Sequence, residues 1–124
     1  MKIFLGLFAL WSASVMVLAS ESAEDLAVRK CGNCHLMGTI TKEKVDKMKA
    51  PPYWAIARKL REAELSRDDK IKFMVEFAFN PKREKMMFPI ETFNRFGLMP
   101  SMSGKVTKEE IEQISTYILG ETRE

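Results

Sequence analysis

The residues with the greatest capacity for chemistry form a single run, Cys31-Gly32-Asn33-Cys34-His35. Two thiols three positions apart on one helical turn can reach the two vinyl groups of a porphyrin and form thioethers. An imidazole directly after the second thiol can then face the iron of the same macrocycle. This spacing is typical of covalent c-type haem attachment. It predicts one haem c per chain, held by Cys31 and Cys34, with His35 as an axial iron ligand.

Three other kinds of site use the same residue types. The chain has two cysteines and one histidine, all in this run, whereas a structural zinc site usually has four such ligands. A thioredoxin-like dithiol lies next to a βαβ pattern, and no such pattern surrounds Cys31. A structural disulfide suits an oxidising compartment but gives His35 no role. Haem attachment is the interpretation that uses all three side chains.

The second axial ligand has to come from another residue type, because the chain has no second histidine. A methionine thioether suits an electron-transfer haem and raises its reduction potential. Met99 precedes Pro100 in a loop before the last expected helix, and the fixed φ of proline stiffens that loop. We therefore expect Met99 to bind the iron. The alternatives are Met102, then Met86, Met87, another group or an open position.

The N-terminal segment predicts export. Lys2 is followed by an apolar stretch over residues 3–19, and Val17-Leu18-Ala19 places small residues where a signal peptidase would cleave. We expect residues 1–19 to be a signal peptide and residues 20–124 to form one domain in the periplasm, where c-type haem is attached. An uncleaved anchor is the alternative, because the stretch is at the short end of what spans a bilayer.

The rest of the chain shows the apolar spacing of helices and no alternating pattern of β-strands. Two sets of residues predict capping boxes at helix starts, Ser66 with Asp69 and Thr107 with Glu110. Proline and glycine mark the expected ends and loops. The expected elements are a helix from about 22 into the cysteine run, helices beginning near 53, 66, 90 and 107, and a loop over 97–104.

A lysine-rich stretch follows the cysteine run and carries Lys42, Lys44, Lys47 and Lys49. It is either a solvated basic face or a docking surface for an acidic redox partner, because charge of one sign near a haem raises encounter rates. Trp54, further along, either packs in the core or hydrogen-bonds a haem propionate. The formal net charge of +3 gives no indication of nucleic-acid binding.

Together these residues resemble the class I c-type cytochromes, small helical domains with C-x-x-C-H near the N-terminus and an axial methionine before the last helix. The resemblance covers residues 23–119. It implies an all-α, orthogonal helical bundle around one covalent haem, and it likens Met99-Pro100 to the family's ligand loop. It also implies that the carbonyl of Pro51 or Pro52 accepts the Nδ1 proton of the proximal histidine.

Two further positions relate to the same family. Tyr117 matches an aromatic residue of the last helix that packs on the first helix. Ala27 departs from the family, which often has an aromatic four residues before the first cysteine.

The resemblance implies a periplasmic electron carrier with His/Met ligation and not an enzyme. Its partners would be redox proteins that donate and accept electrons, and we expect a monomer that is soluble or loosely associated with the membrane. One alternative is a haem-bearing subunit of a larger respiratory or sulfur-oxidising oxidoreductase. Another is a sensor with an open iron position, although cytochromes of that kind usually carry C-x-x-C-H near the C-terminus.

Overall fold

The structure is a computed structural model that describes residues 21–120. Over these residues it contains α-helices and one 3-10 helix but no strand, which confirms the all-α prediction. The elements are α1 (Ala23–Cys31), α2 (Lys42–Asp46), α3 (Tyr53–Glu62), α4 (Arg67–Phe79), η1 (Arg83–Lys85), α5 (Ile90–Phe96) and α6 (Lys108–Leu119).

Hydroxyl side chains cap the starts of α1, α4 and α6, and the sequence predicts the caps of α4 and α6. The side-chain oxygens of Ser22, Ser66 and Thr107 each accept the backbone N–H three residues later at 3.1 Å. In α6 the box is complete, because the Thr107 N–H also donates to Glu110 Oε1 at 3.0 Å. In α4 only the Ser66 half is formed. The carboxylate of Asp69 is one methylene shorter than that of glutamate, which accounts for the missing return bond.

Two helix ends depend on glycine. Gly97 follows α5 with φ +78°, and Gly120 follows α6 with φ +74°. Both values lie in the region that residues with a Cβ rarely adopt, so these glycines stop the helices where the sequence predicts. Helix α4 ends at Phe79, immediately before Asn80-Pro81, as expected.

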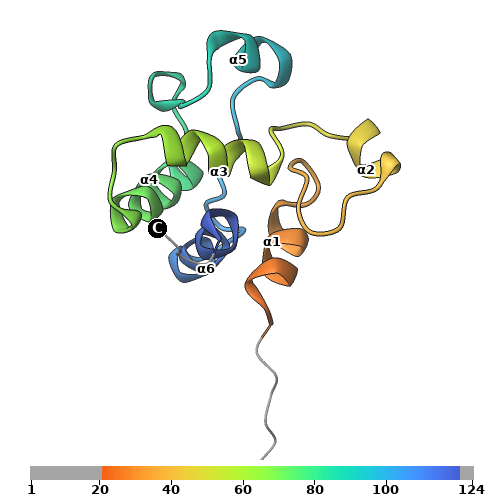
Figure 1. The fold of residues 1–124 in the computed structure, drawn as a ribbon, viewed down its shortest axis with the longest axis horizontal. Helices are drawn as coiled ribbons and strands as arrows, with labels where there is room; N and C mark the ends of the chain where they lie inside the picture. Colours follow the sequence, from red (N-terminus) through yellow and green to blue (C-terminus); the bar gives the residue numbers. More distant parts are fainter. Residues whose placement is uncertain (1–20, 121–124) are drawn as a thin grey trace, which may run out of the picture.

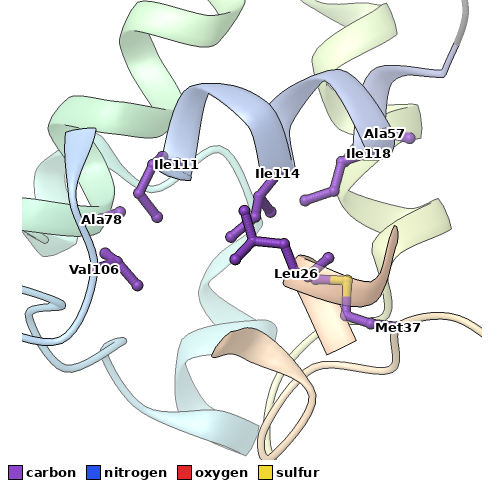
Figure 2. Packing of buried hydrophobic residues seen from close by; sticks show 9 residues of the cluster. Leu26, Met37, Ala57, Ala78, Val106, Ile111, Ile114 and Ile118 are labelled. Carbon is purple, nitrogen blue, oxygen red and sulfur yellow. The ribbon is translucent and has the colours of Figure 1, made fainter. Parts of the chain in front are cut away.

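Helix α6 packs against α4, α1 and α3, and lies between α4 and α1 in the view of Figure 1. Its apolar stripe supplies Ile111, Ile114 and Ile118 to the core. Leu26 of α1 lies next to Ile114 (Figure 2). Ala27 has no exposed surface, so the small residue at the position where the family often has an aromatic side chain is buried in the core of this chain.

Tyr117 packs against the core cluster that includes Leu26 and Ala27 of α1, and it makes further contacts. Its ring lies 5.3 Å from that of Tyr53 in α3, and its hydroxyl accepts the Gly38 N–H at 3.0 Å. Helix α1 packs on α6, with Leu26 and Ala27 in the same core cluster. Tyr117 thus fastens the loop after the cysteine run to α6.

Helices α2 and α5 lie at the periphery of the fold (Figure 1). In the part of the chain that the structure describes, no helix has the length and hydropathy needed to cross a membrane. The predicted signal peptide over residues 1–19 lies outside the described residues.

Candidate functional site

The cysteine run occupies a tight turn at the end of α1. Cys31 is the last residue of this helix, and its carbonyl oxygen accepts the backbone N–H groups of Cys34 at 3.2 Å and His35 at 3.0 Å. Gly32 caps the helix by donating to the Val28 carbonyl oxygen. A Cβ at Gly32 would collide with that oxygen. The turn therefore requires glycine after Cys31 and brings both thiols and the imidazole to one end of α1.

The three side chains line one large cavity in the described part of the protein, with a volume of ≈ 240 Å³. The opposite parts of its wall come from elements far away in sequence. Helix α3 contributes Ile56 and Leu60, and α4 contributes Phe73 and Phe77, whose rings stack with centroids 5.8 Å apart. Helix α6 completes the wall with the isoleucines of its apolar stripe. The lining is largely apolar, which suits a large apolar ligand.

His35 is held in one orientation by the backbone. Its Nδ1 lies 2.6 Å from the carbonyl oxygen of Pro51. Because a carbonyl only accepts, Nδ1 carries the proton and Nε2 keeps its lone pair. Burial lowers the pKa of the imidazole, and the hydrogen bond to Pro51 offsets part of that shift. At neutral pH the ring is therefore the neutral form that binds metals, already fixed in orientation.

Burial keeps Cys31 in its thiol form. Cys31 and Cys34 are both free in the structure. Burial, reinforced by the neighbouring Cys34, raises the pKa of Cys31 to about 11. Redox-active and metal-binding cysteines have lowered pKa values, because the thiolate is the reactive form. Among residues 21–120 no group of three or more His, Cys, Asp and Glu side chains could hold a metal ion. The missing third and fourth ligands among these residues disfavour the zinc interpretation, and the thiol form of Cys31 disfavours the dithiol interpretation.

The methionine candidates also reach this cavity. Met99 and Met102 are both half-buried, pack against the hydrophobic core and line the cavity. Met86 and Met87, from the segment before α5, line it as well. The structure thus brings every thioether that the sequence singles out to the cavity that holds His35.

Two predicted surrounding residues do not reach it. Pro51 lines the cavity, but Pro52 serves as the N-cap of α3 and is absent from the lining. Trp54 is also absent from the lining; it is 43% exposed and meets the Tyr53 ring edge-on at 5.3 Å. Trp54 therefore lies neither in the core nor at the cavity. Only the first proline of the pair belongs to the site.

No protein-family model, no curated protein and no solved structure matches this chain. The site is consequently interpreted from its own residues and geometry.

A positive rim is the feature that sequence reasoning missed. The charged residues that line the cavity are Lys30, Lys49 and Lys59, and no acidic residue lines it. Lys30 also donates to the Lys105 carbonyl oxygen at 2.9 Å, and Lys59 pairs with Glu62 at 3.3 Å. The rim lysines come from three separate elements, so no local run of charge signals them. Of the three, only Lys49 belongs to the lysine-rich stretch that the sequence shows.

The other lysines of that stretch have partners close by. Lys42 pairs with Asp46 at 3.1 Å and Lys47 with Glu43 at 2.8 Å, both one helical turn apart. The Lys44 ammonium donates to the Thr39 carbonyl oxygen at 2.6 Å. These local partners reduce the net positive charge that α2 presents. Lys30 and Lys59 of the cavity lining are also close to carboxylates, at 4.0 Å from Glu110 and 3.3 Å from Glu62. Among residues 21–120, Lys49 is the cavity lysine that makes no ion pair.

Proposed function

We propose that this chain is a monohaem c-type electron-transfer protein, folded as a cytochrome c-like bundle of orthogonal helices around one covalent haem. The observation that carries the proposal is that Cys31, Cys34 and His35 line a single apolar cavity together with Met99. A haem of this kind has four attachments to the protein, two thioether bonds and two axial ligands, and the residue types for all four lie around one space.

The residues of the cavity fit a haem. Its apolar wall from α3, α4 and α6 suits the macrocycle, and its lysine rim supplies positive charge for two propionate carboxylates. The Nε2 lone pair of His35 is available for iron because Pro51 fixes the other nitrogen. Cys31 and Cys34 are free to be alkylated by the vinyl groups. None of the described buried side-chain polar atoms lacks a hydrogen-bond partner. No unpaired polar group in the cavity wall would therefore have to be covered by the apolar macrocycle.

In this mechanism the polypeptide holds the haem and sets its reduction potential. When bound, the haem supplies one-electron exchange between ferrous and ferric iron. His35 would hold one axial position through its fixed tautomer, and a methionine thioether would hold the other and raise the potential. The apolar wall excludes water, which limits solvent reorganisation. With both axial positions filled by protein, the site has no place for a substrate, and we propose a carrier and not an enzyme.

The proposed location is the periplasm, which the signal peptide expected over residues 1–19 supports. The proposed partners are redox proteins with acidic docking surfaces, because the charged side chains that line the cavity are all lysines.

A haem-bearing subunit of a larger oxidoreductase is the second candidate, and exposed apolar side chains near the cavity favour it. Ile90, at the start of α5, is 46% exposed and does not line the cavity. Leu98, just after α5, is 41% exposed and lines the cavity, so a bound haem would cover part of it. The aromatic residues of this segment, including Phe93 and Phe96, are half-buried. Size-exclusion chromatography of a native extract distinguishes the two candidates. A carrier elutes at the mass of one chain, whereas a subunit elutes with its complex.

One absorption spectrum tests the proposal directly. We expect protein made together with haem-attachment machinery to show c-type bands of one haem per chain, a weak sulfur-to-iron charge-transfer band when oxidised, and no immediate spectral change when carbon monoxide is added to the reduced form. A protein that gains no haem under these conditions contradicts the proposal. A spectrum that carbon monoxide changes at once supports the open-site alternative.

The lysine rim makes the rate of electron transfer sensitive to salt. We expect the rate to an acidic redox protein to fall as ionic strength rises, because exposed charges are screened beyond about 8 Å at physiological salt. Lys49→Glu should lower the low-salt rate, whereas Lys108→Glu, on α6 and away from the cavity lining, should change it little. Stopped-flow kinetics measures both. Equal rates for the two variants would show that the rim has no docking role.

A further inference from the structure

The loop that carries the methionines also caps α4. The last four carbonyl groups of a helix have no partner within it. In α4 two of them accept from the loop. The Met102 N–H donates to the Ala78 carbonyl oxygen at 2.8 Å, and Ser101 Oγ donates to that of Phe79 at 2.7 Å. The loop is therefore fastened to the end of a helix that itself lines the cavity.

Ser101 joins two parts of this arrangement. Its hydroxyl donates to α4 and accepts the Ser103 N–H at 3.2 Å, which closes the following turn. Pro100 precedes it with a fixed φ and no N–H of its own. The backbone immediately after Met99 is thus set by a proline and by the Ser101 hydroxyl.

The backbone on the N-terminal side of Met99 has fewer attachments to the rest of the protein. Gly97 has φ +78° and leaves α5, and Leu98 is 41% exposed. Among residues 21–120, no hydrogen bond joins Leu98, Met99 or Pro100 to the rest of the chain. The position of Met99 is consequently set by its packing against the core and by the hydrogen-bonded attachment of the residues that follow it.

We propose that Ser101 is a positioning residue that holds Met99 in place for ligation, by fastening the loop to the C-terminus of α4. This inference rests on the proposed haem function. A neutral hydrogen bond contributes about 0.5–1.5 kcal/mol, and 1.4 kcal/mol is about a tenfold change in an equilibrium. Loss of the hydroxyl should therefore raise the population of the detached loop about two- to tenfold.

Carbon monoxide measures that population, because it binds reduced iron only where the methionine has left. The experiment uses the haem-loaded full chain with Ser101→Ala, Ser101→Thr and Ser103→Ala. We expect Ser101→Ala to bind carbon monoxide about two- to tenfold faster than wild type. Ser101→Thr keeps a hydroxyl and should return to within about twofold. Ser103→Ala is the matched control, because Ser103 takes part only through its backbone N–H.

A second measurement separates positioning from general stability. Far-UV circular dichroism in increasing urea gives the global unfolding midpoint, and the sulfur-to-iron band gives the loss of ligation. We expect the band of Ser101→Ala to disappear at a lower urea concentration than the helical signal. The inference is overturned by equal carbon monoxide rates for Ser101→Ala and Ser103→Ala, or by coincident loss of both signals. A wild-type protein without haem bands instead refutes the proposed function itself.

Discussion

A chain in which Cys31 and Cys34 are both replaced by alanine is expected to carry no covalent haem. Both thiols line the cavity beside His35, and they are the only cysteines of the sequence. With no sulfur left to form a thioether, any haem in the cavity would be held only by ligation and packing. Mass spectrometry of the denatured protein should show the full haem mass on the wild-type chain and none on the variant.

Asn33→Ala is the matched control for this double replacement. Asn33 belongs to the same turn and lines the same cavity, but it has no role in the proposed attachment. It should therefore retain the haem mass at the wild-type level. Gly32 is unsuitable for this purpose, because a Cβ there collides with the Val28 carbonyl oxygen and would disturb the turn itself. Covalent haem on the double variant would show that the cysteines are not the attachment points.

Local chemistry accounts for most of what the sequence could predict of the fold. The hydroxyl cap of Thr107 with Glu110, the stop at Asn80-Pro81 and the short helix over 90–96 all depend on residues within one turn of each other. Such signals need no knowledge of the tertiary structure. The turn of the cysteine run belongs to this group, since its hydrogen bonds connect neighbouring residues.

Contacts between distant residues could not be predicted in the same way. The hydroxyl of Tyr117 reaches Gly38, 79 positions earlier, and the Ser101 hydroxyl reaches the end of α4, 22 positions earlier. The sequence pattern gives which face of a helix is apolar but not which partner covers it. Trp54 illustrates the same limit, because its position in the sequence does not show that 43% of its surface is exposed.

The histidine environment lies between these cases. The family resemblance implies a proline carbonyl as the acceptor for Nδ1 and leaves Pro51 and Pro52 open. The structure has the hydrogen bond at Pro51 and uses Pro52 as the helix cap. The choice follows from the chain direction, since the residue nearer the cysteine run borders the cavity and the next begins α3.

Replacing Met99 by alanine is expected to remove the proposed sixth ligand of the haem iron. Met99 lines the cavity with His35, and no second histidine exists to take its place. Three changes should appear together. The sulfur-to-iron band should vanish, carbon monoxide should bind the reduced protein, and the reduction potential should fall by part of the roughly 0.8 V range that axial ligands span. Absorption spectroscopy and a potentiometric titration measure all three.

Met102→Ala is the control that decides between the two thioethers of the loop. Met102 lines the same cavity, but its backbone N–H is bonded to the Ala78 carbonyl oxygen at 2.8 Å, which holds that residue against α4. Met99 lies beyond the fastened part of the loop and has the greater freedom to approach the iron. We therefore expect Met102→Ala to keep the band, the potential and the resistance to carbon monoxide. If the two variants exchange these properties, Met102 is the ligand and the Met99-Pro100 pattern has another role.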